Sequence, residues 1–178
     1  MPMPMPIAML TAADALRYRA LMLEAYTLAA DAFTSMPEER AVEPESWWLN
    51  RIAHPQGLCV AWGAFEGDAL VGTVAVEYSA KPKTRHKALI IGMYVREAFR
   101  GTGTAQALLA AAVAHVQARP GLRAVMLDVT EGNAPAIALY RRAGFETFGT
   151  EPMAILTPTG FKAKLHMWRT VSNEHADT

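Results

Sequence analysis

The sequence predicts a single α+β domain with a mixed, mostly antiparallel twisted sheet of about six or seven strands, flanked by about four helices on both faces. Three observations predict it. The chain has 178 residues, of which 52% are hydrophobic, so it is about the size of one domain and can bury a core. Valine-rich runs follow one another between residues 58 and 97 with only short polar turns between them. Beyond them, helical and strand-like segments alternate, which is typical of a right-handed crossover between parallel strands.

The predicted domain covers residues 1–178, and its two ends differ from the rest. The Met-Pro repeat predicts a flexible arm over residues 1–6, and the polar last residues predict a disordered tail over 171–178. No repeat or linker divides the chain into two cores.

Composition excludes several classes of protein. Positive and negative side chains balance at 17 each, so no general attraction draws the chain to nucleic acid or anionic lipid. Cys59 is the one cysteine, which rules out an intrachain disulfide and a cysteine zinc site and predicts a buried, inert thiol. No window approaches the ~18 apolar residues of a membrane span, and the first residues do not form a signal peptide. We therefore expect a cytoplasmic protein without a metal, a nucleic acid or a membrane as partner.

The first third of the sequence is predicted to be helical and irregular. A helix over 11–28 begins at Thr11, with Asp14 completing a capping-box pattern. Its apolar face is predicted from leucines and an alanine: Leu16, Ala20, Leu23 and Leu28. Prolines and charges over 29–43 predict a loop, and "PESWWLNRI" predicts a short second helix.

The rest of the chain alternates between the two kinds of segment. Three strands over 58–66, 69–80 and 86–97 are predicted to form an antiparallel meander. A helix over 104–118, a strand over 122–130 and a helix that ends at Gly144 follow. Final strands are predicted in "FETFGTE" and "AKLHMWRTV".

A glycine-rich turn stands where the third strand of the meander gives way to a helix. Its residues are Arg100, Gly101, Thr102, Gly103, Thr104 and Ala105, "RGTGTA". The first N–H groups of a helix have no partners and carry a partial positive charge, so an anion, most often phosphate, is their natural ligand. The Walker loop is excluded because it ends in Gly-Lys-Ser/Thr, whereas this chain has Gly103-Thr104-Ala105 there. The dinucleotide fingerprint fits poorly, since Gln106 stands at its third glycine and Asp128 lies in mid-strand.

These motifs resemble those of the GNAT superfamily, the GCN5-related N-acetyltransferases. "RGTGTA" matches the family's pyrophosphate loop, Arg/Gln-x-x-Gly-x-Gly/Ala, at every fixed position. "IIGMYVREAFRG" resembles the family's fourth strand and the turn after it, and "LDVTEGNAPAIALYRRAGFE" its next motif, with Asn133 and Tyr140. The likeness extends over most of the chain.

The resemblance implies contacts with acetyl-CoA, the co-substrate. The strand end at Met93, Tyr94 and Val95 would contact the pantetheine arm, with hydrogen bonds from the backbone of Met93 and Val95. The turn from Arg100 to Ala105, together with Gln106, would hold the pyrophosphate. Asn133 and Tyr140 would lie beside the pantetheine and the sulfur.

The resemblance also implies direct attack of an amine on the thioester in a ternary complex. Such a reaction needs an oxyanion donor and a proton for the thiolate, and the N–H of Val95 and the phenol of Tyr140 are suitable groups. Glu77 on the neighbouring strand is one candidate for the general base, although it is equally interpreted as a solvated strand residue. If the substrate amine loses its proton to solvent, no dedicated base is needed. His86 is expected to be exposed.

The acceptor is the least defined partner. Phe33, Trp47 and Trp48, with Trp168, are predicted either to line an apolar acceptor pocket or to pack in the core. The expected acceptor is an amine, as a small molecule or peptide. A homodimer is expected through an edge strand or the Met-Pro arm. Two alternatives stay open: transfer of another acyl group or to an oxygen, and a non-catalytic acyl-CoA binder of the same fold.

Overall fold

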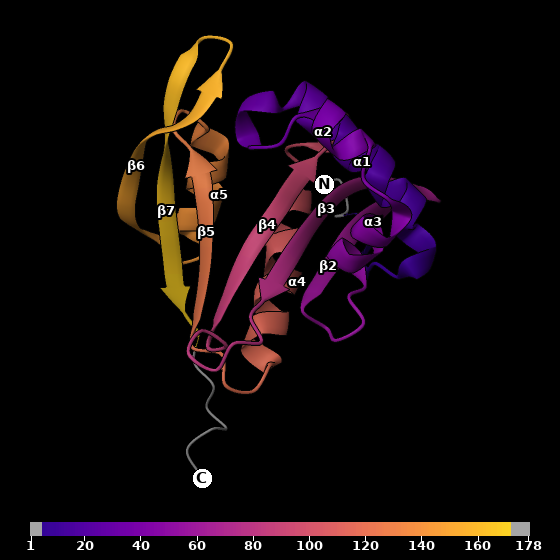
Figure 1. Ribbon diagram of the computed structural model, residues 1–178, viewed down its shortest axis with the longest axis horizontal. Helices are drawn as coiled ribbons and strands as arrows, with labels where there is room; N and C mark the ends of the chain where they lie inside the picture. Colours follow the sequence, from indigo (N-terminus) through magenta and orange to yellow (C-terminus); the bar gives the residue numbers. More distant parts are fainter. Residues whose placement is uncertain (1–4, 172–178) are drawn as a thin grey trace.

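The computed structural model describes residues 5–171, which form one seven-stranded sheet with helices on both faces (Figure 1). The strands are β1 (Ile7–Met9), β2 (Cys59–Glu66), β3 (Ala69–Tyr78), β4 (Lys87–Val95), β5 (Ala124–Thr130), β6 (Glu146–Thr157) and β7 (Gly160–Thr170). The helices are α1 (Ala15–Leu28), α2 (Pro37–Ala41), α3 (Glu45–Ile52), α4 (Thr104–Ala118) and α5 (Ala134–Arg142), with short 3-10 turns η1 (Ala12–Asp14), η2 (Ala30–Ala32) and η3 (Glu97–Phe99).

The order of the strands is β1-β2-β3-β4-β5-β7-β6, and among the described strands only β4 and β5 pair in parallel. The α+β prediction and the parallel crossover through α4 are therefore confirmed. Strand β1 and helix α2 were not predicted, and both are short elements. Residues 1–4 and 172–178, most of the predicted arm and tail, lie outside the described residues. Within the arm, the Pro6 carbonyl accepts a hydrogen bond of 3.0 Å from the Phe65 N–H.

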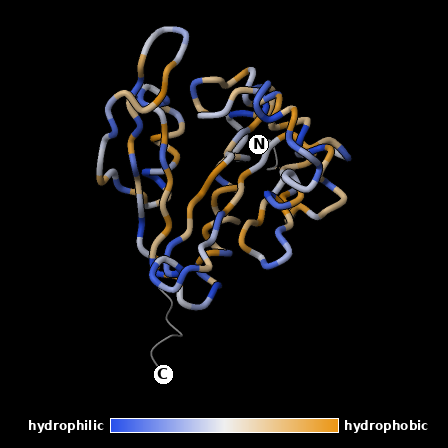
Figure 2. The backbone as a smooth tube through the Cα atoms, viewed as in Figure 1, coloured by the Kyte–Doolittle hydropathy of each residue, from blue (hydrophilic) through white to orange (hydrophobic). Residues whose placement is uncertain are grey.

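Two hydrophobic cores lie on opposite faces of the sheet. One packs α4 and α5 against the strands, and the other packs α1 and α3 against them. Side chains of β3 alternate between the two cores, since Val74 and Val76 face the first core and Ala75 faces the second. In Figure 2 the hydrophobic colour concentrates on the central strands, and the turns at their lower ends are hydrophilic.

The predicted apolar face of the first helix is wrong. Leu16 is 74% exposed and Leu28 is 72% exposed. The buried stripe consists instead of Ala15, Tyr18, Leu21, Met22, Ala25 and Tyr26. Counting aliphatic residues alone misplaced the stripe, because the two tyrosines bury large rings at helical spacing. The predicted capping box is present, since the Thr11 N–H donates to Asp14 Oδ2 at 2.7 Å, but it caps the 3-10 turn η1 and the α-helix begins only at Ala15.

Strands β4 and β5 pair along only part of their length, and this divergence positions the site. Their pairing runs from Lys87 opposite Ala124 to Leu89 opposite Met126, after which the strands separate (Figure 1). Beyond that point β4 carries a bulge, where Gly92 has a φ of +63°. The extra residue exchanges the faces of the strand, so Ile90 and Met93 both lie on the α4 side.

In the part of the chain that the structure describes, no helix is long and apolar enough to cross a bilayer.

Candidate functional site

The glycine-rich turn forms an open anion cradle at the start of α4. Gly101 and Gly103 have φ angles of +74° and +82°, a conformation that favours glycine, and Gly103 is the N-cap of the helix. A Cβ atom built on either glycine meets nothing within 4 Å. The Thr102 hydroxyl folds back onto the Phe99 carbonyl at 2.7 Å. The turn therefore presents backbone rather than side chains to an approaching group, at the positive end of a 15-residue helix.

Arg100 ties this turn to the end of β4. Its Nε donates to the Val95 carbonyl at 2.9 Å, and its guanidinium lies 5.8 Å from the centre of the Tyr94 ring. Arg100 is exposed, so its other N–H groups remain at the surface beside the cradle.

The backbone of Val95 faces the space between the diverging strands. The Arg96 N–H donates to the Val71 carbonyl on β3 at 2.9 Å. Because successive strand residues direct their backbone groups to opposite sides, the N–H of Val95 is directed toward β5. Met93 is half-buried next to the α4 core. Tyr94 is buried on the other face, and its hydroxyl donates to Glu24 Oε2 on α1 at 3.2 Å.

Tyr140 lies on α5, which begins at the end of β5. Asn133 is the N-cap of this helix and accepts a hydrogen bond of 3.4 Å from the Ala136 N–H, so its amide NH₂ group is not used by the cap. Tyr140 is 6% exposed and packs against Phe145. Burial, with the charge of Asp128 as a second cause, raises the pKa of Tyr140 to about 12. The phenol is therefore protonated at neutral pH and available as a donor.

Asp128 is a carboxylate at this opening that the sequence did not single out for catalysis. Leu127 and Val129 face the α4 core, so Asp128 lies on the opposite face of β5, where it is 42% exposed. It stands two residues beyond Met126, the last β5 residue paired with β4. Its Oδ1 lies 3.6 Å from Lys164 Nζ.

Glu77, the base considered from the sequence, lies farther from the opening. It is exposed and opposite Leu89, in the stretch where β4 still pairs with β5. Leu89 precedes Val95 by six residues, which is roughly 20 Å along a strand. His86, expected to be exposed, is exposed.

The predicted acceptor residues gather around α1 and α3. Phe33 packs edge-on against Tyr26 with ring centres 5.4 Å apart, and Trp47 is half-buried beside Arg40 and Arg51. Trp48 is 1% exposed and packs in the core. Trp168 is separate from these residues, half-buried on β7 opposite Met126.

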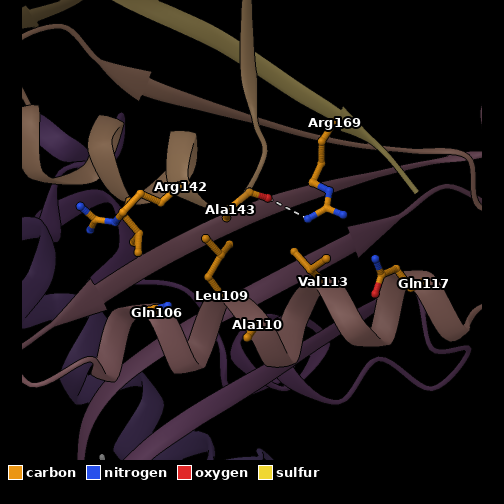
Figure 3. A pocket seen from close by; sticks show the side chains of 9 residues that line it. Gln106, Leu109, Ala110, Val113, Gln117, Arg142, Ala143 and Arg169 are labelled. Atoms are coloured by element: carbon orange, nitrogen blue, oxygen red, sulfur yellow. Dashed lines mark hydrogen bonds between the residues drawn. The ribbon is translucent and has the colours of Figure 1, made fainter. Parts of the chain in front are cut away.

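A cavity of about 310 Å³ opens between α4 and α5 (Figure 3). Gln106, from the first turn of α4, and Arg142, from the end of α5, border it. Arg169 lies at the other end and donates to the Ala143 carbonyl at 2.7 Å. This cavity reaches the cradle through Gln106 and has a cationic rim.

Cys59 is buried, as predicted, and its Sγ donates to the Arg51 carbonyl at 3.0 Å. Burial raises the pKa of its thiol to about 11, so the thiol is unreactive at neutral pH. Within the described residues, no group of three or more His, Cys, Asp or Glu side chains is arranged to hold a metal ion.

Comparisons with known proteins agree on one family. The model of the acetyltransferase (GNAT) family matches residues 22–145. The mycothiol acetyltransferase of Geodermatophilus obscurus is 33% identical over 128 residues, which cover 65% of this chain and 38% of that protein. The L-amino acid N-acetyltransferase AaaT of Escherichia coli is 29% identical over 103 residues, which cover 58% of this chain and 62% of that protein. The chain thus spans less than two thirds of the length of both relatives.

The fold has solved counterparts. A GNAT superfamily phosphinothricin acetyltransferase from Sinorhizobium meliloti, crystallised with AcCoA, superposes with a TM-score of 0.82 at 20% sequence identity. The superposition covers 99% of this chain and 93% of that chain.

Proposed function

The chain belongs to the GNAT family of acetyltransferases, and from this premise we propose that it transfers the acetyl group of acetyl-CoA to a primary amine by direct attack in a ternary complex. The observation that carries the proposal is the meeting of two features at Val95. An open anion cradle begins within a few residues of it, and its backbone faces the gap between β4 and β5. A diphosphate and the extended arm attached to it fit these two features together.

The cradle and the strand end supply the contacts for acetyl-CoA. The N–H groups from Gly101 to Ala105, with Arg100 and Gln106, bind the pyrophosphate. The backbone of Met93 and Val95, with Tyr94 in the same strand end, holds the pantetheine arm as a neighbouring strand would, and Asn133 faces the arm from α5. The cavity between α4 and α5, with Arg142 on its rim, accepts the adenosine end.

The reaction needs one bond made and one broken. The amine nitrogen attacks the thioester carbonyl, and the N–H of Val95 stabilises the oxyanion. The C–S bond then breaks, the amine nitrogen gives its proton to a general base or to solvent, and the thiolate takes a proton from Tyr140, which is reprotonated from solvent. The phenol of Tyr140 is protonated at neutral pH, so it carries the proton that this last step needs.

For the general base we favour Asp128 over Glu77. Asp128 stands at the opening on the acceptor side of β5, and its charge is felt by Tyr140. Glu77 stands where the strands are still paired. The acceptor enters between α1 and the β6–β7 hairpin, near the half-buried Phe33, while Trp47 lies on α3 beside Arg40 and Arg51 and Trp48 serves the core. The names of the two relatives point to different acceptors, so neither is transferred to this chain.

The test is a screen of amine classes with acetyl-CoA, in which release of free thiol is measured. We expect turnover with at least one class of primary amine. If none of the amines causes thiol release under conditions where coenzyme A binds, this would contradict catalysis and favour the non-catalytic binder. Faster turnover with another acyl-CoA, or with an alcohol, would favour the alternatives within the same fold.

Tyr140→Phe separates the enzyme from the binder. Loss of the proton donor is expected to lower kcat by about 10²-fold or more while the Kd for coenzyme A changes little. Tyr78→Phe is a matched control, because Tyr78 is also 6% exposed but lies at the other end of the sheet next to His115. Equal rates for Tyr140→Phe and the wild type would leave Tyr140 with a packing role only.

A further inference from the structure

Lys164 is a poorly paired cation at the opening between the strands. Its side chain is 14% exposed. It donates to Thr34 Oγ1 at 2.9 Å, but the Asp128 carboxylate lies 3.6 Å away, beyond hydrogen-bond distance. An ammonium group has three N–H donors, and a half-buried one is stable only when charged or polar acceptors satisfy them. Lys164 therefore has capacity for a further anionic partner.

Thr130 supplies a second observation at the same place. It lies directly opposite Lys164 in the pairing of β5 with β7, so the two side chains share a face of the sheet. Thr130 is 4% exposed, and among the described residues its hydroxyl has no hydrogen-bond partner. Buried hydroxyls normally have partners, so this one is suited to a polar group of a ligand.

The position of the pair relates it to the reaction. Thr130 is the last residue of β5, four residues beyond the last residue paired with β4. Asp128 is two residues earlier in the strand, so its side chain lies on the same face. The segment between α1 and α2 approaches this end of β5 and contacts the neighbouring strand β7, where Thr34 accepts a hydrogen bond from Lys164. Asp128, Thr130 and Lys164 thus lie next to one another on one face of the sheet, on the side proposed for entry of the acceptor.

We propose that Lys164 and Thr130 bind the carboxylate of a free α-amino acid whose amine faces Asp128. This inference rests on the proposed function and names the acceptor class for it. In an α-amino acid a cation and an anion are attached to a single carbon. Asp128 and Lys164 present opposite charges side by side, 3.6 Å apart, so a zwitterion that lies against both meets a charge of opposite sign at each of its two groups.

Lys162 provides a matched control on the same strand and face. It lies two residues before Lys164 and contacts the same α1–α2 segment, through Asp31 Oδ2 at 2.9 Å. Unlike Lys164, it is 33% exposed, and its ion pair is at hydrogen-bond distance. Lys162 therefore tethers the segment without being available to a ligand.

The experiment compares matched acceptors: L-amino acids, their carboxamides, and the corresponding amines without the carboxyl group. The free acids are expected to have the highest kcat/KM. Lys164→Met is expected to raise KM for the acids by roughly tenfold to a hundredfold, as loss of a charged hydrogen bond does, and to leave the carboxamides unchanged. Thr130→Val should act in the same direction with a smaller effect, and Lys162→Met should keep the preference for acids. Calorimetric binding of a free amino acid to the coenzyme A complex should weaken in parallel in Lys164→Met.

Three results would overturn the inference. One is equal kcat/KM for acids and carboxamides in the wild type. Another is an equal loss on acids and carboxamides in Lys164→Met. The third is the same loss in Lys162→Met, which would reduce Lys164 to a tether. In each of these three results the amines are still acetylated. If no amine of any class caused thiol release, the proposed function itself would be contradicted.

Discussion

In the proposed coenzyme site, Gly103 is the residue on which we expect binding of the diphosphate to depend most. It is the N-cap of α4 with a φ of +82°, and no atom lies within 4 Å of a Cβ built there. Gly103→Val places a branched side chain where the phosphate is expected and strains the backbone. We expect the Kd for coenzyme A to rise by about tenfold to a hundredfold, which corresponds to the loss of one charged hydrogen bond. Calorimetry or fluorescence titration with coenzyme A measures this.

Gly121 supplies the control for that experiment. It has a φ of +83°, lies in the turn after the other end of α4, and also has open space around a built Cβ. Gly121→Val carries a similar strain, on the order of 1–2 kcal/mol for a left-handed position, without reaching the cradle. Equal losses of coenzyme A affinity in both variants would attribute the effect to strain and count against the cradle.

Asp128 and Glu77 can be distinguished as bases by paired amide substitutions. Asp128→Asn removes the carboxylate at the opening and is expected to lower kcat/KM by about 10²–10⁴-fold. Glu77→Gln is expected to have no such effect, because Glu77 lies where β4 and β5 are paired. A large loss in Glu77→Gln alone would reverse the assignment, and normal rates in both would mean that solvent takes the proton.

The glycine-rich turn could be located from the sequence, whereas the residues now proposed for the acceptor side could not, for a physical reason. Arg100 to Gln106 are consecutive, so local rules for glycine and helix ends apply to them. Thr130 and Lys164 are 34 positions apart in the sequence and become neighbours only through the register of β5 with β7. Local patterns do not encode that register. Asp128 was visible as a polar residue in an apolar strand, which was the one available signal.

Helix α4 carries a pH-sensitive contact with β3 near its C-terminal end. The Tyr78 hydroxyl lies 2.7 Å from His115 Nδ1. Burial, with the charge of Arg119 as a second cause, lowers the pKa of His115 in the folded protein. The unfolded chain therefore binds the proton more readily, and the free energy of unfolding should fall as pH drops through about 6.5, the unfolded value, and level off below the folded pKa.

Urea unfolding between pH 5 and pH 8 measures this dependence. His115→Gln keeps a polar side chain but cannot titrate, so its free energy of unfolding should vary less with pH over the same range. Parallel pH curves for the variant and the wild type would show that other groups cause the dependence.

At the scale of elements, the sequence predicted most boundaries because their signals are local. Helix α4 spans Thr104–Ala118, as predicted, and Gly144 follows α5 with a φ of +90°. The predicted strand "FETFGTE" ended where Pro152 follows, yet β6 continues to Thr157. Tertiary pairing with β7 resumes at Ile155 after an irregular stretch in which Met153 has a φ of +49°. Pairing across the hairpin, rather than local propensity, lengthened the strand.

The whole molecule consists of two parts joined by a short parallel pairing. Strands β1 to β4 carry α1, α3 and most of α4's contacts, and strands β5, β7 and β6 form the other part (Figure 1). Ion pairs and hydrogen bonds from Lys162 and Lys164 to the α1–α2 segment join the parts again at the open end. The diverging stretch of β4 and β5 is thus bounded at one end by their parallel pairing and at the other by these contacts.

The far edge of the sheet leads to the last prediction, a homodimer through β6. Strand β6 is a 12-residue edge strand, and the β6–β7 hairpin exposes large apolar side chains: Phe148 at 55%, Met153 at 65%, Leu156 at 70% and Phe161 at 58%. Long edges with exposed apolar residues usually have a partner, and a second copy of the chain related by a two-fold axis is the commonest. Leu156→Glu is expected to convert the dimer into a monomer, measured as mass by light scattering or sedimentation. Leu16→Glu is the matched control, since Leu16 is 74% exposed on α1. A monomeric mass for the wild type at all concentrations tested would contradict the dimer, and dissociation by both variants would move the interface away from β6.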